Sequence, residues 1–177
     1  MRISGIIKND VVNGLGVCVS LFVQGCPHHC KGCFNKETWD FSGGYEKKDL
    51  KETIAEAISK NNIIRNFSVL GGEPLCPENR KEVKEIISFI RAIYPNIKIF
   101  LWTGYTLSEL EKNENNDIKK ILSDIDFLID GPFIQDQKDY TLLLRGSKNQ
   151  KIYKKEKGDF LLILNPEENI GGLNGRS

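Results

Sequence analysis

Short apolar runs alternate with amphipathic stretches along the chain, and this alternation predicts strands that are separated by helices. The apolar runs are rich in β-branched and aromatic residues and are bounded by turn residues, as strands are. The four main runs are residues 17–24 (VCVSLFVQ), 67–72 (FSVLGG), 97–105 (IKIFLWTGY) and 126–133 (DFLIDGPF). Residues 150–155 and 160–164 predict two later strands.

Apolar residues at helical spacing predict helices between these strands. The first lies within residues 47–60, and the second has Pro77 in its first turn, where no backbone donor is missed. A third begins at Thr106, which has the spacing of a capping box with Glu109, and the polar residues 111–116 interrupt it. The apolar positions are Leu50, Ile54, Ala57 and Ile58 in the first helix, and Val83, Ile86, Ile87, Ile90 and Ile93 in the second.

Strands that alternate with helices predict parallel β-α units joined by right-handed crossovers. The chain of 177 residues is too short for a complete β/α barrel, which takes about 250 residues. We therefore expect an α/β fold that forms a partial, open β/α barrel of parallel strands, as one domain over residues 1–164. Residues 165–177 are rich in Gly and Asn, and we expect them to form a flexible C-terminal tail.

Composition narrows the choice of partners. With 25 basic and 24 acidic residues the net charge is only +1, so a broad surface for nucleic acid is not suggested. No apolar run approaches the ~20 residues that span a bilayer, and the N-terminus lacks the apolar core of a signal peptide. We expect a cytoplasmic protein that binds neither nucleic acid nor membrane. In a reducing cytoplasm, five cysteines indicate metal binding or redox chemistry more than disulfides.

The unusual segments of the sequence each follow a predicted strand. The cysteine-rich stretch GCPHHCKGCF (25–34) follows the first strand, GGEP (71–74) the second, TGY (103–105) the third and DGP (130–132) the fourth. Ligand sites in α/β folds lie at the carboxyl ends of the strands. We therefore expect these four segments to meet at one edge of the sheet, which we call the rim.

The cysteine-rich stretch offers three thiolates with C-x3-C-x2-C spacing, from Cys26, Cys30 and Cys33. A structural zinc site needs four protein ligands, and the fourth would be His28, His29 or the distant Cys76. A 4Fe–4S cluster is also held by cysteine sulfurs. With three of them it leaves one iron open to the amino and carboxylate groups of a small molecule. The spacing alone leaves a cluster, zinc and plain structural thiols as alternatives.

The Gly-Gly-Glu-Pro segment favours ligand binding. Two glycines at the end of a buried strand let the backbone approach a ligand closely, and Glu73 can accept a hydrogen bond from an ammonium group. On its own the segment is better explained as a turn, but its place on the rim beside three cysteines favours the ligand site. We expect packing roles for Cys18, Cys76, Trp39 and Trp102.

These motifs resemble those of the radical S-adenosylmethionine (SAM) enzymes. Among them the chain is most similar to the activating proteins of anaerobic ribonucleoside-triphosphate reductase. The resemblance covers roughly residues 11–151 and rests on VNGLGVCVSLFVQGCPHHCKGCFNKETWDFSGG, LGGEPLCPENR, WTGYTLSEL, IDGPF and LRGSKNQ. The flanks of the cysteine motif and the late RGS-x-NQ are specific to this subgroup.

The resemblance implies a role for each matching residue. Cys26, Cys30 and Cys33 would ligate a 4Fe–4S cluster whose open iron chelates SAM. Gly72 and Glu73 would meet the methionyl ammonium. Gly32, Cys33 and Phe34 would border the adenine and sulfonium side, and Thr103 and Asp130 the ribose or carboxylate side. Many superfamily members carry an aromatic residue where this chain has Gly32, and the nearby aromatic here is Phe34, so the resemblance leaves the detail of the adenine contact open.

The resemblance also implies a radical oxidoreductase activity with no acid–base residues. A reduced cluster would cleave SAM to methionine and a 5′-deoxyadenosyl radical, which takes a hydrogen atom from a glycine of the reductase. Reduced flavodoxin or a similar protein would donate the electron. The alternatives are activation of another glycyl-radical enzyme, such as pyruvate formate-lyase, and a non-enzymatic zinc module that binds a protein partner. Activases of the former kind commonly have longer chains and lack RGS-x-NQ.

Overall fold

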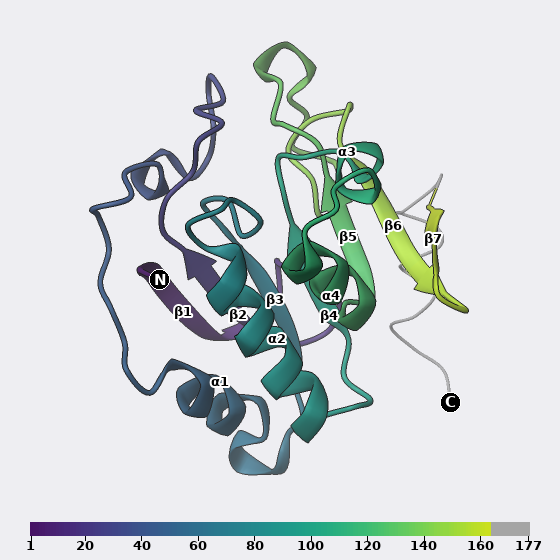
Figure 1. The fold of residues 1–177 in the computed structure, drawn as a ribbon. Coiled ribbons are helices and arrows are strands. Elements are labelled where there is room, and N and C mark those ends of the chain that lie inside the picture. Colours follow the sequence, from purple (N-terminus) through teal and green to yellow (C-terminus); the bar gives the residue numbers. More distant parts are fainter. Residues whose placement is uncertain (164–177) are drawn as a thin grey trace.

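Within residues 1–163, seven strands form one open sheet in which the spatial order equals the order along the chain (Figure 1). The computed structural model describes residues 1–163, so the predicted tail at 165–177 lies outside the described residues. The strands are β1 (Ile3–Asp10), β2 (Cys18–Val23), β3 (Asn66–Gly71), β4 (Ile99–Trp102), β5 (Phe127–Asp130), β6 (Lys151–Glu156) and β7 (Asp159–Leu162). Strands β2 to β5 run parallel, whereas β1, β6 and β7 are antiparallel to their neighbours. The open α/β fold is thus confirmed, with a parallel centre and antiparallel flanks.

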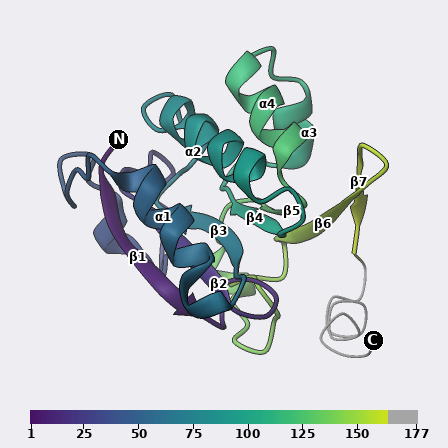
Figure 2. The same cartoon turned by 90° about the horizontal axis from the view of Figure 1, so that it is seen from below.

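The helices cover one face of this sheet (Figure 2). They are α1 (Leu50–Ile58), α2 (Arg80–Ile93), α3 (Leu107–Glu111) and α4 (Asn116–Asp124), with short 3-10 turns at Lys36–Thr38, Lys60–Asn62 and Gln135–Gln137. No helix within residues 1–163 is long and apolar enough to cross a membrane.

The two faces of the sheet bury different sets of side chains, because successive residues of a strand point to opposite faces. On β2, Val19, Leu21 and Val23 belong to the main core, which includes the buried sides of α1, α2 and α4. Cys18 belongs to a smaller cluster with Phe100, Phe127 and other buried residues. This confirms the packing role predicted for Cys18.

The third helix is interrupted as predicted. The side chain of Thr106 and that of Glu109 form a reciprocal capping box at the start of α3, and Asn115 caps α4 through its side-chain oxygen. The polar residues between them end the first helix and begin the second, because a capping side chain satisfies the free N–H groups of a first turn.

The sequence prediction was wrong about the start of α2. This helix begins at Arg80, so Pro77 precedes it rather than lying in its first turn. The N–H of Asn79 donates to the carbonyl of Cys76 at 3.1 Å, which places Pro77 at the second position of a β-turn, where its fixed φ is favoured. At the other end of the helix Ile93 is 46% exposed, so the apolar stripe ends at Ile90.

Strand β1 was not predicted. It lies at the sheet edge, and only its end residues Ile3 and Asp10 are buried. Edge strands are exposed along much of their length, so the hydrophobic pattern that marks a buried strand is weak here.

Candidate functional site

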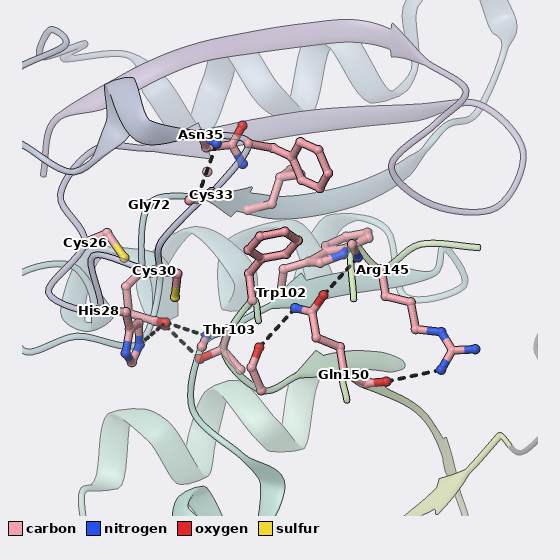
Figure 3. A pocket seen from close by; sticks show the side chains of 18 of the residues that line it. Cys26, His28, Cys30, Cys33, Asn35, Gly72, Trp102, Thr103, Arg145 and Gln150 are labelled. Carbon is pink, nitrogen blue, oxygen red and sulfur yellow. Dashed lines mark hydrogen bonds and ion pairs between the residues drawn. The ribbon is translucent and has the colours of Figure 1, made fainter. Parts of the chain in front are cut away.

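A cavity of about 420 Å³ opens at the carboxyl ends of the parallel strands (Figure 3). Phe22, Leu70 and Trp102 form part of its wall, and they alternate along their strands with residues of the helix-covered core. The cavity therefore lies on the sheet face opposite the helices. All four rim segments contribute lining residues, among them Cys26, Gly72, Thr103 and Gly131. The predicted convergence of these segments is confirmed.

The cysteine loop runs from the end of β2 to the 3-10 turn at Lys36–Thr38 and is held by backbone hydrogen bonds. Gly25 donates to Thr38 O at 2.8 Å, and Cys26 donates to Trp39 O at 3.1 Å. Gly25 has a φ of +91°, and a Cβ on it would overlap the ring of Phe41. Glycine is thus needed where the chain leaves the strand.

All three cysteine thiols of the loop line the cavity. Burial raises the pKa of Cys26 to about 11, although the backbone N–H groups of His28 and His29 act against this. Burial likewise raises the pKa of Cys30. The thiols of Cys26 and Cys30 are therefore protonated at neutral pH, and a metal has to displace each proton in order to bind. The N–H of Asn35 points at the sulfur of Cys33, 3.4 Å away, and such contacts tune iron–sulfur centres.

The donor set fits an iron–sulfur cluster better than a zinc ion. Within residues 1–163 no three Cys, His, Asp or Glu side chains are gathered closely enough to hold a single metal ion. Zinc ligands converge on one point, whereas a cluster binds each thiolate through a different iron. Among the candidates for a fourth ligand, Cys76 is completely buried, and it is absent from the cavity wall. His28 is paired with Glu73 at 2.9 Å.

The Gly-Gly-Glu segment continues the pairing of β3 with β2 beyond the strand ends. Gly72 donates to Val23 O at 2.8 Å and Glu73 donates to Gly25 O at 2.8 Å. A Cβ on Gly72 would overlap the carbonyl oxygen of Gly25, so only glycine fits. This close packing brings Gly72 and Glu73 to the cavity wall.

Not every predicted site residue reaches the cavity. The lining includes Cys26, Cys30, Cys33, Phe34, Gly72, Glu73 and Thr103, but not Gly32 or Asp130. Asp130 is buried, and its carboxylate accepts from the N–H groups of Leu107 at 2.6 Å and Lys151 at 3.3 Å. Burial raises its pKa. A Cβ on Gly32 would lie 2.9 Å from Oε1 of Gln135, so Gln135 takes the space beside this glycine.

Sequence reasoning missed several residues of the wall. Trp102, predicted to be a packing residue, lines the cavity, and its Nε1 donates to Leu144 O at 2.7 Å. Gln150 also lines the cavity. Its Oε1 accepts from the N–H groups of Gly146 at 2.9 Å and Ser147 at 3.2 Å, while its Nε2 donates to Gly131 O at 3.0 Å.

The RGS-x-NQ stretch was the available signal for this part of the wall. Asn149 Nδ2 donates to Pro132 O at 2.7 Å, so both amide side chains of the stretch bind the turn after β5. The stretch thus fixes the wall opposite the cysteine loop.

Comparison with known proteins agrees with this geometry. Residues 12–153 match the family described as a 4Fe-4S single cluster domain, so the site belongs to the class of proteins that carry one such cluster. The chain is 41% identical to a protein of Vibrio cholerae over 82% of this chain and 92% of that one. It is 39% identical to a protein of Escherichia coli K12, over 81% of this chain and 92% of that one. It is 36% identical to a protein of Enterobacteria phage T4, over 89% of this chain and 97% of that one. All three are named anaerobic ribonucleoside-triphosphate reductase-activating protein, and the chain belongs to this family.

Proposed function

We propose that this chain activates an anaerobic ribonucleoside-triphosphate reductase by generating the glycyl radical of that enzyme, through reductive cleavage of SAM at a 4Fe–4S cluster. The observation that carries the proposal is the cavity wall, to which all three cysteines of the C-x3-C-x2-C loop and the Gly-Gly-Glu segment contribute. The names of the relatives support the choice of reductase. The open sheet with its parallel centre supports a partial barrel of the radical SAM type.

Cys26, Cys30 and Cys33 would hold the cluster, and one iron would have no protein ligand. When bound, the cluster would supply the electron that cleaves SAM to methionine and a 5′-deoxyadenosyl radical. The N–H of Asn35 would donate to the sulfur of Cys33 beside the cluster, and such hydrogen bonds tune the reduction potential.

The residues proposed to border SAM are those of the predicted set that line the cavity: Cys33, Phe34, Gly72, Glu73 and Thr103. Gly72 and Glu73 would lie on the side of the methionyl ammonium, as the resemblance implies. Phe34 would border the adenine. Gly32 and Asp130 would act by shaping the wall, Gly32 by admitting the side chain of Gln135 and Asp130 by holding the backbone of Leu107.

The remainder of the wall would keep water from the reacting centre. Phe22, Trp102 and Phe133 contribute apolar surface to it, and excluding water prevents side reactions of reactive intermediates. The partner would present its glycine at the open side of the cavity, and reduced flavodoxin or a similar protein would donate the electron.

Anaerobic reconstitution tests the proposal. We expect a brown protein with about four irons per chain, and an EPR signal of the reduced cluster that changes when SAM is added. Mixing it with the reductase, SAM and a reductant should give a glycyl-radical doublet. A doublet on pyruvate formate-lyase alone would assign the chain to another activase, and a colourless protein with stoichiometric zinc would contradict the proposal.

A further inference from the structure

The buried carboxylate of Glu73 has both oxygens engaged by other groups of the chain. Oε1 accepts from the N–H of Leu75 at 2.8 Å and from the hydroxyl of Thr103 at 2.8 Å. Oε2 accepts from the N–H of Gly104 at 2.7 Å and lies 2.9 Å from Nε2 of His28. A carboxylate offers about four lone-pair sites and donates nothing when ionised. These four groups therefore fill it, and His28 carries its proton on Nε2.

The four partners of Glu73 come from three segments of the rim. His28 belongs to the cysteine loop, Leu75 to the segment after β3, and Thr103 and Gly104 to the segment after β4. One side chain thus joins the ends of three neighbouring parallel strands. A buried charge is tolerated only when it is paired and hydrogen-bonded, so this arrangement depends on every partner.

The imidazole of His28 is fixed on several sides, and it lies beside Cys30 (Figure 3). Its ring meets Tyr105 edge-on, with ring centroids 4.7 Å apart. A Cβ on Gly104 would overlap the ring, so the backbone there leaves room for this side chain. The side chain of His28 is only 20% exposed.

The neighbouring His29 has a different environment. It is exposed, has a φ of +48°, and tilts against Trp39 with ring centroids 4.9 Å apart. Of the two histidines in the loop, His28 is the one that pairs with Glu73.

We propose that His28 and Glu73 form a positioning pair that fixes the cysteine loop to the ends of β3 and β4, and that Glu73 acts through this pair rather than as a direct acceptor for the methionyl ammonium. The inference rests on the proposed function for the identity of the ligand. Its geometric basis is the filled carboxylate and the place of His28 between Cys26 and Cys30. Loss of the imidazole takes one of the two partners from Oε2 of Glu73, which keeps the N–H of Gly104, and it releases the loop.

Two substitutions of His28 separate the hydrogen bond from the bulk of the ring. His28→Gln retains an N–H donor for Glu73, whereas His28→Leu removes it. His29→Asn is the matched control, because Asn tolerates a positive φ. Circular dichroism and thermal unfolding of each variant show whether the sheet is intact.

The first measurement follows cleavage by trypsin after Lys31, an exposed residue of the loop, in the full-length protein without cluster. We expect His28→Leu to be cut roughly tenfold faster than wild type, because breaking a buried pair by removing one partner is strongly destabilising. His28→Gln should return most of the protection and His29→Asn should match wild type. This measurement needs neither SAM nor a reductase, so it decides the inference even if no glycyl radical is formed.

The second measurement follows iron release to a chelator from the anaerobically reconstituted protein, together with the EPR spectrum of the reduced cluster. His28→Leu and Glu73→Gln should both lose iron faster and broaden the signal. The double variant should be no worse than the worse single variant, because partners in one interaction are not additive.

Two results would overturn the inference. One is wild-type rates of trypsin cleavage and iron release in His28→Leu. The other is a Glu73→Gln protein that keeps its iron like wild type but binds SAM roughly tenfold more weakly, since this would make Glu73 a direct acceptor.

Discussion

The imidazole ring of His28 fills the space beside Gly104 that a side chain at position 104 would need. Gly104→Ala should therefore displace the ring and weaken its contact with Glu73. We expect a loss of about 1–3 kcal/mol in the free energy of unfolding, as for other overpacked sites. Chemical denaturation measures it. Gly5→Ala is the control, because a Cβ on Gly5 meets nothing within 4 Å, and it should not destabilise the protein.

The three cysteines of the loop should differ sharply from Cys76 in their effect on cluster binding. Cys26→Ala, Cys30→Ala and Cys33→Ala should each abolish stable binding of four irons and SAM cleavage, because each removes one cluster ligand. Cys76→Ala should keep most of both, since Cys76 lies outside the cavity wall. Iron analysis and methionine release after anaerobic reconstitution check this. An indispensable Cys76 beside a dispensable Cys26 would show that the ligand set is wrong.

Gln150 should contribute to stability through the three backbone groups that it binds. Gln150→Ala leaves these groups without their partner, and an unsatisfied buried group costs about 1–3 kcal/mol. We expect this loss in denaturant unfolding. Gln150→Glu should also destabilise the protein, because it keeps the accepting oxygen for Gly146 and Ser147 but sets a second oxygen against the carbonyl of Gly131. The exposed Gln137 serves as the control, and an equal loss in Gln137→Ala would contradict the prediction.

The capping box of α3 should make a pH-dependent contribution to the free energy of unfolding. Hydrogen bonds from the hydroxyl and the backbone N–H of Thr106 hold the pKa of Glu109 below its ordinary value of 4.5. A carboxyl with a lowered folded-state pKa stabilises the protein above its unfolded-state pKa, and this contribution disappears as the pH falls through the folded-state pKa. Glu109→Gln keeps an accepting oxygen but no charge.

We therefore expect wild type to be more stable than Glu109→Gln by about 0.5 kcal/mol or less near neutral pH, because the pair is exposed. The difference should disappear as the pH falls below 4.5, because the carboxyl of Glu109 then becomes protonated and loses its charge. Unfolding curves of both proteins across this range measure it, and a difference that grows in acid would contradict the prediction.

Much of the site could be predicted from the sequence because its parts follow buried strands. The runs ending at Gln24, Gly72 and Tyr105 are predominantly apolar and are followed by turn residues, and parallel strands carry their following segments to one edge. This reasoning located the cysteine loop, Gly72, Glu73 and Thr103 on one wall. Family resemblance then supplied the cofactors, which spacing alone left open.

The remainder depends on contacts that a local pattern does not contain. The role of Glu73 as the centre of a hydrogen-bond network involves Thr103, which is 30 residues away, and His28, which is 45 residues away. The amide of Gln150 binds a turn 19 residues before it. Strand β1 was not predicted because an edge strand needs little apolar surface. Asp130 was placed in the site because its strand ends there, but its carboxylate is buried and binds the backbone of Leu107 and Lys151.

The order of the strands has a consequence for how the chain reaches its native state. Each strand pairs only with its neighbours along the sequence, from β1 to β7. No strand therefore has to insert between two that are already joined, and the sheet can grow from one edge as the ribosome releases the chain. The two strands that flank the cysteine loop and the Gly-Gly-Glu segment, β2 and β3, are among the first to emerge.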